Sequence, residues 1–156
     1  MRVVLQRVTT AAVEIDGTEV ASIGAGFLLL VCVAHGDDAP VIARAARKVA
    51  GLRLFEDAAG KMNLDLATVE GGLLVVSQFT LLADASRGRR PSFEGAAAGE
   101  LAEPLVELFV ELLRREGLTV ATGRFGARMK ITLVNDGPVT LVLDFTGSPG
   151  SAESSG

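Results

Sequence analysis

The pattern of apolar and polar residues predicts strands in the first part of the chain. We expect strands from Val3 to Leu5 and from Ala11 to Ile15, and Asp16-Gly17 separates the second of them from Thr18-Glu19-Val20. Asp-Gly between two alternating runs indicates a tight hairpin, because both residues tolerate positive φ. Gly26 to Ala34 is an unbroken apolar run, which predicts a central strand that is fully buried.

Apolar residues at helical spacing predict two helices. The first begins after Asp37-Asp38, whose carboxylates can cap free N–H groups, and it tolerates Pro40 in its first turn. Its apolar positions are Val41, Ile42, Ala45, Val49 and Leu52. The second helix is expected from about Glu100 to Glu116, before Gly117. Its predicted core stripe consists of Leu101, Leu105, Leu108 and Leu112.

The remaining strands complete the predicted fold. They are expected at Arg53 to Glu56, Leu73 to Val76, Thr119 to Thr122, Met129 to Val134 and Val139 to Phe145. Strands outnumber helices, and short turns join several of them. This favours an α+β fold, with a mixed, mostly antiparallel sheet or partly closed β-barrel and two packed helices. Residues 1–145 form one predicted domain, and the tail 146–156 lacks periodicity, which predicts disorder.

Composition narrows the class of protein. A net charge of -4 argues against a non-specific nucleic-acid coat, although a local basic patch remains compatible with it. The single cysteine, Cys32, excludes an intrachain disulfide and fits a reducing compartment. A signal peptide is not expected, because Gln6 and Arg7 interrupt the first apolar run early. No apolar stretch is long enough to span a bilayer. We therefore expect a soluble, cytoplasmic protein.

The side chains that common catalytic devices require are scarce. His35 is the sole histidine and lies in a turn, where a solvated side chain is usual. One histidine and one cysteine are too few for a zinc site, so no metal is expected. Gly24-Ala25-Gly26 precedes a strand, so no dinucleotide cofactor is expected either. Cys32 is typical of a small buried hydrophobe. An enzyme with this sequence would use backbone groups, hydroxyls, amides, arginines or groups of its substrate.

Two polar segments at strand ends are candidates for a functional site. Ser77-Gln78-Phe79-Thr80-Leu81 follows a buried strand, and backbone N–H groups at such an end can face a developing oxyanion. Asn135-Asp136-Gly137-Pro138-Val139-Thr140 lies between two predicted strands. Taken alone, the first segment fits a strand that leaves the core, and the second fits an ordinary turn. A Gly-Pro bond can also be cis, which turns the flanking carbonyls to one side.

Taken together, the two segments resemble the D-aminoacyl-tRNA deacylase family in its Gly-Pro form. The resemblance covers about residues 1–145 and begins with MRVVLQRV. It also includes Gly60 to Leu64, Arg87 to Phe93 and Gly123 to Met129, in the same order and spacing. Each segment alone is weak evidence, whereas their combination is specific. The tail after Phe145 lies outside the resemblance.

The resemblance implies a homodimer with its active site at the subunit interface. Gly137-Pro138 would be cis and would enter the partner's site, where its two carbonyl oxygens fix the α-amino group of the substrate. An L side chain would collide with this motif, whereas a D side chain would point to solvent. Arg7 would help to hold the orientation of the motif.

The resemblance also implies the chemistry of the site. The pocket for the terminal adenosine and the ester would be lined by Ser77, Gln78, Phe79, Thr80, Phe125 and Met129. Backbone N–H groups near Phe79 and Thr80 are candidates for the oxyanion hole. The Thr80 hydroxyl lacks a base to activate it, so the 2′-hydroxyl of the terminal ribose would assist water instead.

The expected partner is aminoacyl-tRNA, including glycyl-tRNA(Ala). Arg87, Arg89 and Arg90 form a tight basic cluster that either pairs with acceptor-stem phosphates or is a solvated loop. Two other functions stay open. An esterase or amidase for another small acyl compound would not need the RNA 2′-hydroxyl, and a non-catalytic RNA-binding module would ignore acylation of the 3′ end. The acidic charge and the scarcity of aromatic residues weigh against the module.

Overall fold

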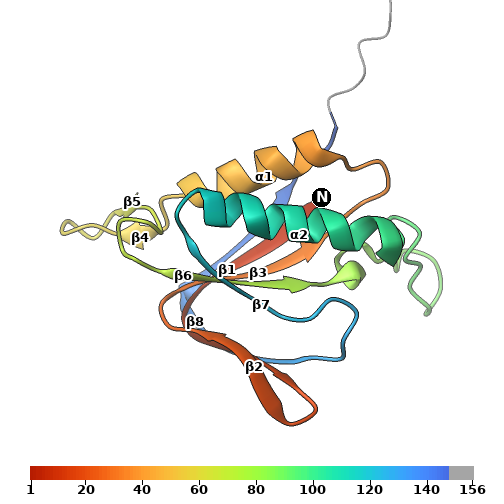
Figure 1. Ribbon diagram of the computed structural model, residues 1–156, viewed down its shortest axis with the longest axis horizontal. Coiled ribbons are helices and arrows are strands. Elements are labelled where there is room, and N and C mark those ends of the chain that lie inside the picture. The colour runs from red at the N-terminus through yellow and green to blue at the C-terminus, as the bar shows by residue number, and fades with distance from the viewer. Residues whose placement is uncertain (148–156) are drawn as a thin grey trace, which may run out of the picture.

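Two helices lie side by side on one face of a curved six-stranded sheet (Figure 1). The computed structural model describes residues 1–147, so most of the tail predicted to be disordered lies outside the described residues. The strands of the sheet are β1 (Arg2–Ile15), β2 (Thr18–Ile23), β3 (Gly26–Cys32), β6 (Gly72–Ser77), β7 (Thr119–Thr122) and β8 (Lys130–Asp144). β1 pairs antiparallel with β2, β3 and β8, whereas β3, β6 and β7 run parallel. The predicted α+β fold with a mixed sheet is confirmed.

The long strand β1 organises the sheet. Strands predicted at residues 3–5 and 11–15 form one continuous strand, which pairs with β8 along one edge. The other edge pairs first with β3 and then with β2. Thr9 and Thr10 are exposed where the pairing with β8 shifts register, which is why the apolar pattern breaks there. Because β1 pairs with β8 on one edge and with β2 and β3 on the other, the sheet curves into a partly closed barrel.

The ordinary turn that residues 135–140 fit when taken alone does not form. These residues lie inside β8, whose two halves both pair antiparallel with β1. Val8 pairs with Asn135 and Gln6 pairs with Thr140, so residues 136–139 bulge outward opposite Arg7 alone. Turn-forming residues here create a bulge because the chain keeps its direction on both sides of it.

The helices are α1 (Ala39–Gly51) and α2 (Gly99–Arg115). Asp38 caps α1 as predicted, since its side chain accepts a hydrogen bond from Val41 N at 3.1 Å. The core stripe predicted for α2 is partly wrong, because Leu101 is 64% exposed. The buried positions are Ala102, Phe109, Val110 and Leu113, with the other predicted leucines half-buried beside them. The helix is apolar over a wide face, and packing on the sheet selects a row adjacent to the predicted one.

Apolar residues pack on both faces of the sheet. One core lies between the sheet and the helices and includes Phe27 and Phe109. A second core, around Val13, Leu28 and Leu74, fills the inside of the curve. A small hairpin of β4 (Phe55–Glu56) and β5 (Met62–Leu64) projects from one end of the molecule (Figure 1). Within residues 1–147, no helix has the length and hydropathy that a membrane crossing requires.

Candidate active site

A cavity of about 450 Å³ opens at the end of β6. It is bounded by the short 3-10 helix η1 (Phe79–Leu82), the N-terminal part of α2 and the loop between β7 and β8. This volume is typical of small-molecule sites. Among the residues predicted from the sequence, those that line the cavity are Ser77, Gln78, Phe79, Phe125 and Met129.

Strand β6 ends at the wall of this cavity. Ser77 pairs with Val31 in the parallel β3–β6 ladder, and Gln78 N donates to Val31 O over 2.8 Å. The chain then turns into η1, which leaves the side chain of Phe79 59% exposed. The ring meets Phe93 edge to face at a centroid distance of 5.1 Å. An aromatic pair in the wall of a cavity is a surface on which a nucleobase can stack.

Two backbone N–H groups begin η1 and have no partner within that turn. The first hydrogen bond of the turn runs from Leu81 N to Gln78 O, so the N–H groups of Phe79 and Thr80 precede it. Cys32 Sγ donates to the Phe79 carbonyl at 3.4 Å, which holds the peptide between Phe79 and Thr80. Backbone donors held in this way suit an oxyanion hole.

The side chain of Thr80 lies apart from the cavity. Thr80 is exposed, is absent from the residues that line the cavity, and accepts a hydrogen bond from Gln78 Nε2 through its hydroxyl. No histidine, lysine or carboxylate lines the cavity to activate a hydroxyl. The side chain of Thr80 therefore lies outside the cavity, and its backbone N–H follows Phe79, which lines the cavity.

Cys32 alone is titratable among the residues that line the cavity, all of which belong to the described part of the chain. Burial raises the pKa of its thiol above the ordinary value, so the neutral and weakly nucleophilic form prevails at neutral pH. The prediction that Cys32 is buried is confirmed, as is the exposed position of His35. Across residues 1–147, no cluster of three His, Cys, Asp or Glu side chains is arranged to hold a metal ion.

The Gly137-Pro138 bulge is a second group of predicted residues. The Gly137-Pro138 peptide bond is cis, as predicted, and both residues are exposed. Gly137 has φ of 130°, and a β-carbon there would lie 2.8 Å from Val139 Cγ2, so the position requires glycine. Asn135 braces the bulge, because its Oδ1 accepts from Val139 N at 3.0 Å and its Nδ2 donates to Thr140 Oγ1 at 2.9 Å.

Arg7 lies behind the bulge and is only 6% exposed. Its Nε donates to Asp136 O at 3.2 Å and lies 3.5 Å from Asp136 Oδ2, while its Nη1 donates to Leu54 O at 2.5 Å. The guanidinium also lies 6.0 Å from the centroid of the Phe55 ring. A buried cation requires such partners. Through them Arg7 fixes the backbone next to Gly137.

The two groups do not form one cavity within a single chain. Gly137, Pro138 and Arg7 are absent from the residues that line the 450 Å³ cavity. The structure thus brings Ser77, Gln78 and Phe79 together in the cavity. It places the bulge and Arg7 together at a separate position.

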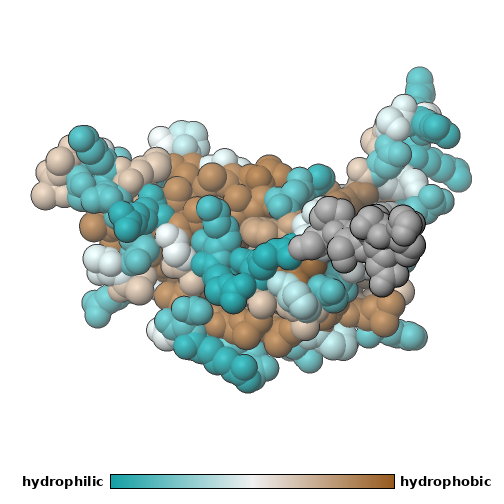
Figure 2. Space-filling model, turned by 90° about the horizontal axis from the view of Figure 1, so that it is seen from above, coloured by the Kyte–Doolittle hydropathy of each residue, from teal (hydrophilic) through white to brown (hydrophobic). Residues whose placement is uncertain are grey.

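The three predicted RNA-binding arginines lie on a third feature, an exposed loop. Arg87, Arg89 and Arg90 are all exposed, and a bridge between Asp84 and Ser92 closes the loop. Hydrogen bonds from Ser86 lower the pKa of Asp84, which keeps this carboxylate charged at the base of the loop. Figure 2 shows hydrophilic residues on projections at both ends of the molecule, and this loop forms one of them.

Sequence reasoning missed part of the cavity wall. Phe93 and Ala97 also line it, on an irregular segment that the apolar pattern did not resolve. Their position depends on contacts distant in sequence, such as Ala97 N donating to Val33 O at 2.9 Å. The aromatic side chain of Phe93 within an otherwise polar loop was the available signal.

A curved mixed sheet with two helices, and a cavity walled by backbone groups and uncharged side chains, defines an α+β protein with a pocket for a small ligand group. The chain belongs to the D-Tyr-tRNA(Tyr) deacylase family, which it matches over residues 4–144. The resemblance identified from the sequence is therefore confirmed.

Curated relatives agree with this assignment, and solved structures share the fold. The chain is 60% identical over 144 residues to a D-aminoacyl-tRNA deacylase of Thermomicrobium roseum, covering 92% of this chain and 94% of that protein. It is 53% identical to one of Geobacter sulfurreducens, covering 92% and 95%. The structure of a c-Myc DNA unwinding element binding protein superposes with a TM-score of 0.87 at 36% identity, covering 94% and 100%. A probable eukaryotic D-amino acid tRNA deacylase, at 16% identity with a TM-score of 0.78 and coverage of 91% and 97%, shares the fold.

Proposed function

We propose that this chain is a cytoplasmic hydrolase that cleaves the ester between a D-amino acid and the 3′-terminal ribose of tRNA. Family membership supports the reaction class. One observation supports the mechanism: two backbone N–H groups at the start of η1, next to the cavity, have no partner within that turn, and neither a base nor an activated nucleophile lines the cavity. Catalysis in such a cavity depends on position and on charge stabilisation.

In this mechanism the terminal adenosine occupies the cavity and the ester carbonyl faces the start of η1. Water attacks the carbonyl carbon with assistance from the neighbouring 2′-hydroxyl of the ribose. The N–H groups of Phe79 and Thr80 stabilise the oxyanion. The bond from the carbonyl carbon to O3′ then breaks, and a proton passes to O3′. The products are the free D-amino acid and a tRNA with an intact 3′ end.

The site requires two copies of the chain in this proposal. The Gly137-Pro138 bulge is exposed and separate from the cavity of its own chain. Large apolar side chains are also exposed, with Phe79 at 59%, Leu101 at 64% and Val142 at 61%. Exposed apolar surface is typical of faces that partner chains cover. In a homodimer, each bulge would enter the cavity of the other subunit.

In this proposal the enzyme selects D-aminoacyl esters by excluding L side chains. The carbonyl oxygens of Gly137 and Pro138 would accept hydrogen bonds from the α-ammonium group of the substrate. An L side chain would then point into the bulge, which Arg7 and Asn135 hold in place. A D side chain would point away, so that no contact reads its identity. The loop with Arg87, Arg89 and Arg90 would pair with phosphates of the acceptor stem.

Matched D- and L-tyrosyl-tRNA test this function directly. We expect the protein to release D-tyrosine from D-tyrosyl-tRNA over many catalytic cycles and to leave L-tyrosyl-tRNA intact over the same time. Spontaneous hydrolysis in buffer is the baseline for both esters. Equal rates on the two esters would refute the chiral selection, and rates at the buffer baseline for both would refute the activity.

A further inference from the structure

A second cavity, of about 320 Å³, adjoins the first along α2 and β7. Ser77, Val106 and Phe125 belong to the walls of both cavities, so the two are immediate neighbours. In Figure 1, α2 lies above β7. Residues of both elements, and of the start of the loop after β7, line the second cavity. The proposed mechanism does not use this cavity, although its volume is sufficient for a small ligand group.

Charged side chains surround the second cavity. Glu103 and Glu107 lie one turn apart on the same face of α2, and Arg114 and Arg124 also line the cavity. Arg114 donates to Val120 O at 3.0 Å. Within residues 1–147, neither glutamate has a cation within ion-pair distance, and Arg124 has no carboxylate within that distance. Both acceptors and a donor of charge-assisted hydrogen bonds therefore remain open to a ligand.

We propose that this cavity binds the cytidine that precedes the terminal adenosine of tRNA. The inference rests on the proposed function, which places that adenosine in the first cavity. Phe125, in the wall between the cavities, offers a ring to neighbouring bases. The exocyclic amine of cytosine donates to a carboxylate, and Glu103 and Glu107 supply two. Arg124 pairs with the phosphate that links the two nucleosides.

A cytidine contact of this kind would recognise tRNA through its shared 3′ end. Mature tRNAs share a 3′ end in which cytidine precedes adenosine, so a contact to this cytidine selects tRNA as a class. The wall chemistry also disfavours uridine, because uracil presents a carbonyl oxygen where cytosine presents its amine, and two carboxylates repel that oxygen.

Three small esters test the proposal without a tRNA body: D-tyrosyl adenosine, D-tyrosyl cytidylyl-adenosine and D-tyrosyl uridylyl-adenosine. We expect kcat/KM to be about tenfold higher on the cytidylyl ester than on the uridylyl ester, mainly through KM. In the double variant Glu103→Gln/Glu107→Gln this ratio should fall close to one. Glu111→Gln, one turn further along α2 and outside the cavity, is the matched control and should keep the tenfold ratio.

The possible outcomes distinguish failure of the cytidine site from failure of the proposed function. A ratio near one for the unmodified protein, or a tenfold ratio that survives in the double variant, overturns the cytidine site. Hydrolysis of D-tyrosyl adenosine over its L counterpart tests the proposed function independently, since this ester has no second nucleoside. If the D ester is not hydrolysed, the proposed function fails and the cytidine site fails with it.

Discussion

A single methyl group at position 137 tests the proposed filter. In Gly137→Ala the new β-carbon would lie 2.8 Å from Val139 Cγ2 and 3.2 Å from Arg7 Nη2, at a φ of 130°. The bulge must shift, and a displacement of about 1 Å can cost about 100-fold in rate. We expect a loss of kcat/KM of that order in steady-state assays on D-tyrosyl-tRNA.

Gly60→Ala is the matched control for this substitution. Gly60 also has positive φ, at 75°, but a β-carbon there meets nothing within 4 Å. We expect its kcat/KM to stay within about twofold of the unmodified protein. Full activity in Gly137→Ala, or equal losses in both variants, would show that the bulge does not act as described.

The side chain of Thr80 is expected to be dispensable. Its hydroxyl accepts from Gln78 and lies outside the cavity, whereas its backbone N–H begins η1. Thr80→Ala keeps that N–H, so we expect a loss below about tenfold in single-turnover hydrolysis. Replacing the terminal ribose by its 2′-deoxy form should cost far more. A loss of about 10⁴-fold in Thr80→Ala with the fold intact would identify a nucleophile instead.

Local patterns predicted those features that depend only on residues close together in the sequence. The hairpin at Asp16-Gly17, the cap at Asp38 and the buried strand that ends at Ser77 all follow from short-range chemistry. The bulge at residues 136–139 does not, because it depends on which strand β8 pairs with. The burial of Ala102 in place of Leu101 depends in the same way on how α2 sits on the sheet.

The candidate site also contains residues that local sequence predicts and residues that depend on long-range contacts. Ser77, Gln78 and Phe79 are contiguous in sequence, so a motif predicts that they share a pocket. Phe93 and Ala97 join them through contacts across the fold, and Glu103 lies on a helix that shows no signal beyond its amphipathic pattern. The resemblance named Arg7, but its partner Leu54 lies 47 positions away. Such long-range pairs have no signature in a single sequence.

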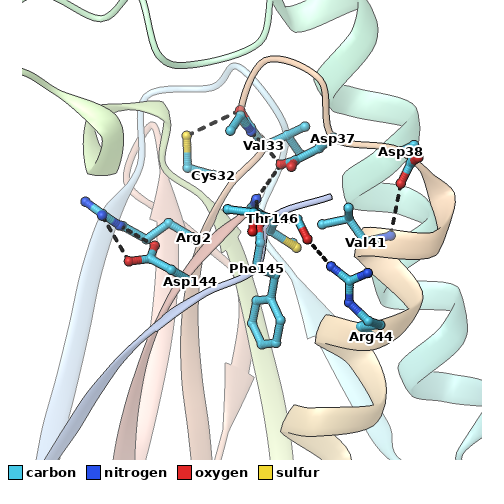
Figure 3. A network of polar contacts seen from close by, with 12 residues as sticks. Arg2, Cys32, Val33, Asp37, Asp38, Val41, Arg44, Asp144, Phe145 and Thr146 are labelled. Carbon is cyan, nitrogen blue, oxygen red and sulfur yellow. Dashed lines mark hydrogen bonds and ion pairs between the residues drawn. The ribbon is translucent and has the colours of Figure 1, made fainter. Parts of the chain in front are cut away.

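A buried ion pair ties together the ends of three strands (Figure 3). The ammonium of Met1 lies 2.5 Å from Asp37 Oδ2 and donates to Phe145 O at 2.7 Å, and Asp37 also accepts from Ala34 N. The side chains of Met1 and Asp37 are 0% and 5% exposed. Removing one partner of a buried pair leaves an uncompensated charge. We expect Asp37→Asn to lower the free energy of unfolding by about 3 kcal/mol in urea titrations at pH 7.

Asp144→Asn is the contrasting control. Asp144 pairs with Arg2 at 2.8 Å, but the side chains are 53% and 36% exposed, so the expected loss is below about 1 kcal/mol. The hydrogen bond from Arg2 lowers the pKa of Asp144 in the folded state. The contribution of Asp144 is therefore present above the unfolded-state pKa and is lost as the pH falls through the folded-state pKa. Equal losses in Asp37→Asn and Asp144→Asn would contradict the role given to burial.

Mixing two strongly impaired variants tests whether the site spans two chains. Gly137→Ala damages the bulge, and Ala97→Phe fills the cavity in which Ala97 lies. In a mixed dimer, one site combines an intact cavity with an intact bulge from the partner. After refolding an equal mixture, we expect about one quarter of the unmodified rate on D-tyrosyl-tRNA, because half the dimers are mixed and each has one good site. Activity no higher than the mean of the separate variants would place both parts of the site in one chain.

Glycine distinguishes rejection of L side chains from attraction of D side chains. Glycyl-tRNA has an α-ammonium group for the carbonyl oxygens of Gly137 and Pro138, but it has no side chain that the bulge can exclude. A filter that acts by collision therefore hydrolyses it, whereas a site that binds D side chains lacks the contacts it needs.

We expect glycyl-tRNA and D-alanyl-tRNA to be hydrolysed at rates within about tenfold of each other, and L-alanyl-tRNA to be spared. Arg7 and Asn135 hold the bulge by several hydrogen bonds, so its backbone does not yield to the methyl group of L-alanine. The measurement is the initial rate for all three esters on one tRNA body, with buffer hydrolysis subtracted. Glycyl-tRNA as resistant as L-alanyl-tRNA would mean that the site selects D residues by contact with their side chains, and the exposed bulge would then need another role.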